Sequence, residues 1–240
     1  ALILGRPEST TQESSTCRVD LDGQKISLEA KPNAPLKFRR NGNRWETVLN
    51  LAQNSLAKTP RLQGPIDDAF LGRFIMVRPT GKPMNATTGK WVQKEMKYAI
   101  TEWHRQFRGN AILMDDEEVQ HPDAMKANLI LWGDPHSNSY LAKIVDKLPV
   151  QWSEKGIRLK DKSWPSDKFV PVLVYPNPFN LKKYIVLNSG FTFSEFGHMS
   201  NSMQNAKLPD YAVLDMAVPI TERIPKGVVH AGFFGERWEL

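Results

Sequence analysis

Short apolar runs that do not alternate with polar residues constrain the fold of this 240-residue chain most strongly. Residues 74–77 read FIMV and residues 128–132 read NLILW. Runs of this kind are typical of strands that are buried on both faces, as in a parallel sheet covered by helices. Residues 91–107, which lie between the two runs, place their apolar side chains on one helical face. We therefore expect an α/β domain in which strands and helices alternate.

Later segments extend this pattern. A second helix is expected from about 139 to 148, and further strands over 157–159, 169–175, 184–187, 211–216 and from 228 onward. The sequence Pro176-Asn-Pro178 separates two of these strands, so those two could form an antiparallel pair. The predicted fold class is α/β: a flavodoxin-like, three-layer structure with an open, mostly parallel sheet covered on both faces.

The first part of the chain has a different pattern. Apolar and polar residues alternate on both sides of Asp22-Gly23 and again on both sides of Asn41-Gly42, and such dipeptides favour hairpin turns. Residues 16–48 are therefore predicted to form a small antiparallel β unit. We expect two domains: residues 1–58, which hold this unit with an irregular lead-in and a connector, and residues 59–240, which form the α/β domain.

Composition excludes several classes of protein. Seven Trp and eleven Phe are too many for a disordered chain, and no apolar stretch is long enough to span a membrane. The net charge of +6 is not gathered into a long basic stripe, so we expect no nucleic-acid partner. Cys17 is the only cysteine, which excludes an intramolecular disulfide and a cysteine-based zinc site. Because the chain starts with Ala1 and not with Met, we expect a processed chain or a fragment.

Three polar turns that contain glycine follow three of the expected buried strands. In parallel strands these turns would meet at the edge where open α/β sheets bind ligands. The second turn also opens a helix, whose free N–H groups favour an anion. The alternative is that these residues only turn the chain and cap the helix, and no phosphate-binding fingerprint is present. The predicted ligand-binding residues are Thr80, Gly81, Asp134, His136, Ser137, Asn138, Asn188 and Ser189.

The sequence does not assign a catalytic residue, a metal site or a cofactor. Ser189 imitates the nucleophile of a G-x-S-x-G turn, but the first glycine is missing. His136, His198 and His230 could serve as bases, although any pairing with Ser189 is a guess. The histidines lack the spacing of metal ligands, and the acidic run 115–118 is expected to be a solvated face. Whether the chain has enzymatic activity stays open.

Several segments, taken in order, resemble the C-terminal region of large bacterial prolyl oligopeptidase-like α/β-hydrolases, a family of serine peptidases and esterases. They are 62–70 (LQGPIDDAF), 79–81 (PTG), 128–138 (NLILWGDPHSN), 187–193 (LNSGFTF), 209–216 (PDYAVLDM) and 231–238 (AGFFGERW). Segments 19–24 (VDLDGQ) and 38–45 (FRRNGNRW) resemble the part that joins the hydrolase domain to this region. The likeness covers roughly residues 16–240.

The resemblance implies a non-catalytic role, because the serine, acid and histidine of that family lie in the preceding domain. The chain would be an accessory region that orients or gates a serine-hydrolase catalytic domain, or binds its substrate, a peptide or a plant polysaccharide ester. Such hydrolases are usually exported, so a periplasmic or extracellular location is expected. Trp45, Trp132 and Trp164 are candidate platforms for sugar rings, although tryptophans more often belong to the core.

Two alternatives to the accessory role stay open. The first is a small-ligand or anion-binding α/β module that uses the polar turns at the carboxyl edge of the sheet. The second is a self-contained serine hydrolase with Ser189 as its nucleophile.

Overall fold

The computed structural model describes residues 2–4, 15–30, 35–48, 56–192, 207–218 and 227–240. The chain divides into two compact units, Ala1–Ser55 and Leu56–Leu240. Each unit is built around its own sheets, and each is described by itself.

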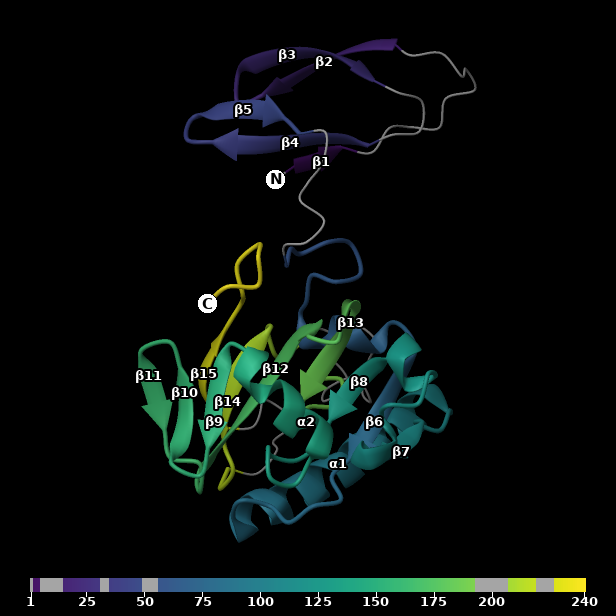
Figure 1. Ribbon diagram of the computed structural model, residues 1–240, viewed down its shortest axis with the longest axis vertical. Coiled ribbons are helices and arrows are strands. Elements are labelled where there is room, and N and C mark those ends of the chain that lie inside the picture. Colours follow the sequence, from purple (N-terminus) through teal and green to yellow (C-terminus); the bar gives the residue numbers. More distant parts are fainter. Residues whose placement is uncertain (1, 5–14, 31–34, 49–55, 193–206, 219–226) are drawn as a thin grey trace. The chain divides into compact units, whose positions relative to one another are not determined.

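The first unit consists of hairpins (Figure 1). Its strands are β1 (Leu2–Leu4), β2 (Ser15–Leu21), β3 (Gln24–Ala30), β4 (Leu36–Asn41) and β5 (Arg44–Thr47). Strand β2 pairs antiparallel with β3, and β4 pairs antiparallel with β5 and β1, which confirms the two predicted hairpins. The Gln24 side chain donates to the carbonyl of Trp45 and accepts from its N–H, both at 2.7 Å, and so joins the two hairpins.

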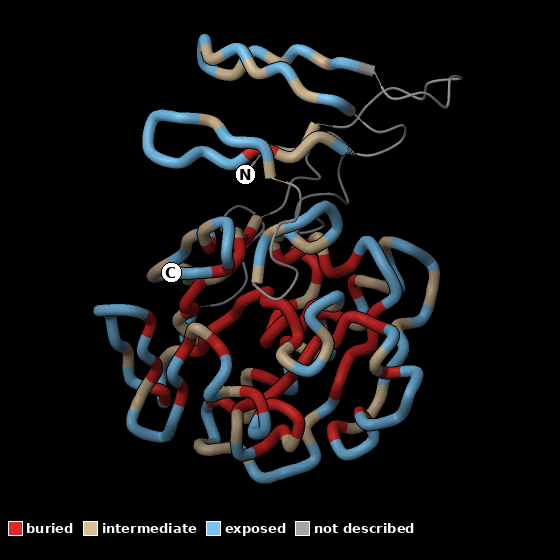
Figure 2. The backbone as a smooth tube through the Cα atoms, turned by 45° about the horizontal axis from the view of Figure 1, so that its top comes forward, coloured by how far each residue is buried: buried red, intermediate tan, exposed pale blue. Residues whose placement is uncertain are grey.

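A seven-stranded sheet with the order β15-β14-β12-β13-β8-β6-β7 forms the centre of the second unit (Figure 1). Its strands are β6 (Phe74–Arg78), β7 (Leu113–Asp115), β8 (Asn128–Leu131), β12 (Phe169–Asn177), β13 (Asn180–Leu187), β14 (Tyr211–Asp215) and β15 (Val228–Gly232). Strands β7, β6, β8 and β13 run parallel, whereas β12, β14 and β15 are joined by antiparallel pairs. Buried residues gather in the interior of this unit (Figure 2), and all four residues of β8 are buried.

The predicted flavodoxin-like, three-layer fold is wrong. The structure is 39% strand and 22% helix, its large sheet is mixed, and the described residues hold two α-helices. The parallel order ends at β13 because the turn between β12 and β13 is too short for anything but a hairpin, and a parallel connection needs a dozen or more residues. A separate three-stranded sheet consists of β9 (Val150–Ser153), β10 (Gly156–Leu159) and β11 (Lys162–Trp164), in the order β11-β10-β9. Residues 194–205, for which the sequence predicts a polar, weakly helical stretch, lie outside the described residues.

Helix α1 (Ala86–Phe107) is the long helix of the second unit. It starts five residues before the predicted helix because Asn85 caps it: the Asn85 side chain accepts from the N–H of Thr88 at 2.8 Å. A methyl group on Gly190 would lie 2.7 Å from Cβ of Ala99, so the glycine lets α1 approach the chain that leaves β13. No helix in the described ranges has the length and apolar character of a membrane span.

The remaining helices are short. The second α-helix, α2 (Ser139–Ile144), is followed directly by the 3-10 turn η4 (Val145–Lys147). Three further 3-10 turns, η1, η2 and η3, span Ile66–Phe70, Asp116–Glu118 and Ala124–Lys126.

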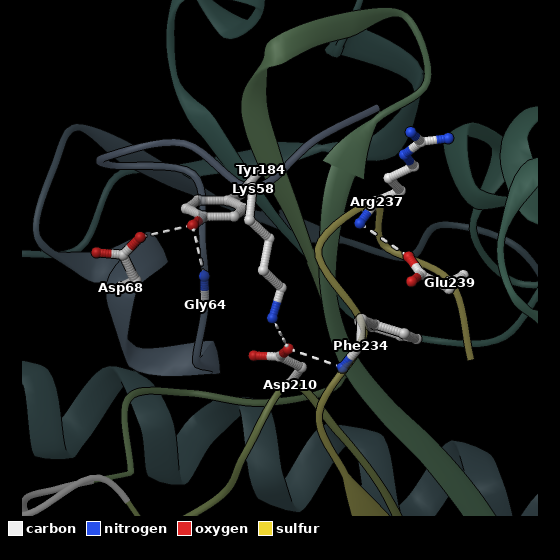
Figure 3. Close-up of polar contacts among 8 residues, drawn as sticks. All are labelled: Lys58, Gly64, Asp68, Tyr184, Asp210, Phe234, Arg237 and Glu239. Atoms are coloured by element: carbon white, nitrogen blue, oxygen red, sulfur yellow. Dashed lines mark hydrogen bonds and ion pairs between the residues drawn. The ribbon is translucent and has the colours of Figure 1, made fainter. Parts of the chain in front are cut away.

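Polar contacts hold the segment before β6 and the C-terminal turn against the sheet (Figure 3). The Tyr184 hydroxyl donates to Oδ2 of Asp68 at 2.5 Å and accepts from the N–H of Gly64 at 2.9 Å. Burial and the hydrogen bond to Asp68 raise the pKa of Tyr184 above its ordinary value. Asp210 accepts from Nζ of Lys58 at 2.5 Å and from the N–H of Phe234 at 2.9 Å. The Tyr184 contacts lie at the amino end of β8, where the N–H of Tyr184 donates to the Asn128 side chain at 3.0 Å.

Candidate functional site

The three predicted turns meet at the carboxyl edge of the parallel strands. Val77, Leu131 and Leu187 are paired across β6, β8 and β13, so the three chains leave the sheet at the same level. The chain runs from β6 outward to β7 and then returns to β8 on the other side of β6, which makes this edge a topological switch point.

Direct hydrogen bonds join the turns. The N–H of Gly81 donates to the carbonyl of Ser137 at 2.9 Å. Asn188 accepts from the N–H of Gly133 and donates to its carbonyl, both at 2.9 Å. A Cβ at position 81 would lie 2.8 Å from the carbonyl oxygen of His136, so glycine is needed for this close approach.

Asp134 organises the turn that follows β8. Its side chain is fully buried and accepts three backbone hydrogen bonds, from the N–H groups of His136 and Ser137 at 2.9 Å and from that of Met84 at 3.0 Å. Asn138, which is also fully buried, accepts from the N–H of Leu141 at 2.9 Å and so caps α2. The polar side-chain atoms of Asp134 and Asn138 are therefore hydrogen-bonded to backbone groups of their own chain.

Asp116 occupies the place where an anion was expected. Its carboxylate accepts from the N–H of Ser139, at the start of α2, and from the N–H of Thr80 at 2.9 Å. Burial alone would raise the pKa of Asp116, but the hydrogen bonds from Ser139 and Thr80 outweigh it and lower the pKa below its usual value. The chain thus supplies its own anion at this helix end.

The sequence pattern predicted a solvated acidic run here, so Asp116 was missed. The one available signal was its position directly after a short apolar run that ends at the same edge of the sheet.

Ser189 and the described histidines do not form a hydrolase constellation. The Ser189 hydroxyl, 7% exposed, donates to the carbonyl of Gly190 at 2.8 Å. Nδ1 of His136 lies 3.4 Å from Oε1 of Glu154. His198 lies outside the described residues. Within the described residues, the Ser189 hydroxyl is therefore hydrogen-bonded to a backbone carbonyl and not to a histidine ring.

A small cavity of about 220 Å³ lies beside the carboxyl edge, between the turns and α1. Its wall carries one guanidinium, Arg78, which is paired with Asp115 at 2.8 Å. Asp134 and Ser137, two buried residues of the turn that follows β8, also line it. The remaining lining residues are Pro79, Gly81, Pro83, Gly89, Val92, Gln93 and Met96. Two carboxylates beside one guanidinium make this cavity unfavourable for an anion.

A second and wider cleft, of about 710 Å³, lies along the three-stranded sheet. This sheet consists of β9 (Val150–Ser153), β10 (Gly156–Leu159) and β11 (Lys162–Trp164). Val150, Trp152, Ile157 and Leu159 are buried, whereas Gln151, Ser153 and Arg158, which alternate with them, are exposed. Sequence reasoning missed this site because it predicted only the middle strand.

Two of the three candidate sugar platforms, Trp132 and Trp164, are packed against other side chains. Trp132 is 1% exposed and belongs to the core. The Trp164 ring stacks on the ring of His230, with centroids 5.4 Å apart and an interplanar angle of 24°. Burial, followed by the charge of Lys162, lowers the pKa of His230. Trp45, in the first unit, donates its Nε1–H to Asp22 at 3.0 Å.

Comparisons with protein-family models, with curated proteins and with solved structures found no match. Within the described ranges there is no cluster of three or more His, Cys, Asp or Glu side chains that could hold a metal ion. Function must therefore be argued from the geometry and from the motifs of the chain itself.

Proposed function

We propose that this chain is an accessory region of a prolyl oligopeptidase-like hydrolase that binds the hydrolase's substrate and leaves bond cleavage to a separate catalytic domain. The observation that carries the proposal is the contrast between two sets of polar groups. Those at the carboxyl edge are bonded to the chain's own backbone, whereas those along the wide cleft are exposed. The ordered motifs that resemble the family add independent support.

A fluorophosphonate probe tests whether bond cleavage is left to a separate domain. The probe labels the activated serine of serine hydrolases, and the Ser189 hydroxyl is bonded to a carbonyl, which does not activate it. We expect no adduct on the purified chain under conditions that label a serine hydrolase added as a positive control. An adduct that disappears in Ser189→Ala would overturn the proposal in favour of a self-contained hydrolase.

Kinetics with an added catalytic domain test the binding role. The chain is mixed with a prolyl oligopeptidase-like catalytic domain, and the KM is measured for a polymeric substrate and for a small chromogenic ester. A substrate-binding accessory region lowers the KM for the polymer and leaves that for the small ester unchanged, because only the polymer reaches both domains. Identical KM values with and without the chain would contradict the proposal.

The small cavity beside α1 supports a second candidate function, a module that binds a small, polar, uncharged or cationic molecule. Its position at a topological switch point favours this reading, and its mixed charge disfavours an anion. Gln93→Trp, which places a large side chain at the wall of the cavity, is expected to abolish such binding without disturbing the wide cleft.

A further inference from the structure

We propose that the wide cleft along β9, β10 and β11 binds an acidic oligosaccharide, a chain of uronate sugars. This inference rests on the proposed function, because it takes the cleft as the surface where the hydrolase's substrate binds. It names the chemical class of that substrate from the side chains that line the cleft.

A row of three polar side chains crosses the sheet. Gln151, Arg158 and Ser163 are paired across the three strands, one residue from each. All three are exposed and line the cleft. Within the described part of the chain, none of these side chains makes a hydrogen bond or an ion pair. Their donors and acceptors are therefore available to a ligand.

The charge of the cleft favours an anion. Arg158 and Lys155, at the turn between β9 and β10, are both exposed and line it. Asp146 is the only acidic side chain among the lining residues, so the cations outnumber it. The net charge of +6 on the whole chain adds a weaker attraction over a longer range. A guanidinium binds a carboxylate through two parallel hydrogen bonds, which makes Arg158 the expected carboxylate contact.

The position of the row distinguishes a sugar from a peptide. An extended peptide gains most of its affinity by pairing its backbone with a sheet edge. Gln151, Arg158 and Ser163 instead lie across the face of the sheet, where a ligand meets side chains. Such a ligand needs many hydrogen-bonding groups at close spacing, and the amide and the hydroxyl of the row both donate and accept. Sugar hydroxyls also do both, and a uronate adds the carboxylate for Arg158.

Titration calorimetry with trigalacturonate tests the inference, with the neutral galactose trisaccharide and a tetraglutamate peptide as comparison ligands. We expect the full chain to bind trigalacturonate, with an affinity that falls as salt is added, and to bind the two other ligands at least ten-fold more weakly. Equal binding of the neutral trisaccharide would overturn the role of charge. Tighter binding of the peptide would overturn the choice of a sugar.

Matched variants locate the site. Arg158→Gln is expected to weaken binding of trigalacturonate about ten-fold or more. Arg158→Lys is expected to weaken it less, because lysine keeps the charge but cannot form the two parallel hydrogen bonds of a guanidinium. Lys182→Gln removes another exposed cation, from β13, which does not line the cleft, and should leave binding unchanged. An unaltered affinity in Arg158→Gln would overturn the inference.

The outcome for the proposed function is read separately. If trigalacturonate fails to bind while the chain still lowers the KM of the catalytic domain for its polymer, the substrate class is wrong and the accessory role stands. If the KM effect is also absent, both proposals fail.

Discussion

The carboxyl edge of the parallel strands and the face of the β9–β11 sheet use similar residues in opposite ways. At the edge, Asp134, Asn138 and Asn188 are at most 2% exposed and are bonded to backbone groups. On the face, Gln151 and Arg158 are exposed and make no bonds within the described residues. Burial therefore separates polar residues that hold the fold from those that are free to bind.

The comparison also explains why a site at the edge was a reasonable expectation. Ligand-binding edges and self-bonded edges both place Gly, Ser, Asn and Asp after parallel strands, because both must satisfy the free N–H groups of turns and helix starts. Here Asp116, from the end of the neighbouring strand β7, bonds the N–H groups that a bound anion would otherwise take. A carboxylate from the same chain can thus take up the N–H groups at such an edge, so that they no longer bind a ligand.

The largest expected effect comes from Asp134→Ala. The substitution removes the side-chain acceptor of three N–H groups, those of Met84, His136 and Ser137, and each loss costs about 1–3 kcal/mol. We expect the free energy of unfolding in urea to fall by about 3–5 kcal/mol. Asp167→Ala is the control, because that carboxylate is exposed and has no partner in the described part of the chain. A loss below about 1 kcal/mol for Asp134→Ala would remove the distinction between the edge and the face.

A smaller effect, with a dependence on pH, is expected for Asp116→Asn. The amide can accept from one of the N–H groups of Thr80 and Ser139 but presents a donor to the other, which costs about 1–3 kcal/mol near neutral pH. The pKa of Asp116 is lowered in the folded state, so its stabilisation is complete above the unfolded value of 3.8 and is lost as the pH falls toward the folded pKa.

The gap between wild type and Asp116→Asn should therefore be constant from about pH 7 to pH 5 and should shrink below about pH 4. Urea unfolding at a series of pH values measures it, with Asp167→Asn as the control for the general effect of charge. A gap that stays constant down to pH 2 would show that the hydrogen bonds of this carboxylate do not stabilise the edge.

The strands of the large sheet could be predicted because burial on both faces leaves an apolar run, as in β6 and β8. The first hairpin turn of the first unit could be predicted because Asp22 and Gly23 both adopt positive φ, which few residue types tolerate. At the second turn Gly42 adopts positive φ, whereas Asn41 ends β4. The direction of β12 relative to β13 was also present in the sequence, in the shortness of their connection. The short connection between β12 and β13 excludes a parallel pair, so the expectation of a mostly parallel sheet was wrong at this point.

Other features could not be predicted from local pattern. Strands β9 and β11 have four and three residues, too few for alternation to stand out, so the cleft along their sheet was missed. The role of Asp116 depends on partners 23 and 36 residues away along the chain. The burial of Trp132 and the stacking of Trp164 on His230 likewise depend on which strands are neighbours.

The smallest expected effect is on the face. Gln151→Ala, Arg158→Gln and Ser163→Ala each remove an exposed side chain without a partner in the described residues, and such changes usually alter stability by less than about 0.5 kcal/mol. We expect the urea midpoint and the slope of the transition to match those of the wild type, which also ensures that a loss of ligand binding in Arg158→Gln reports on the contact and not on the fold. If any of the three variants loses more than about 1 kcal/mol of unfolding free energy, the polar side chains of the row are bonded within the chain, as those at the carboxyl edge are. The two surfaces would then no longer differ in the property from which the binding role was inferred.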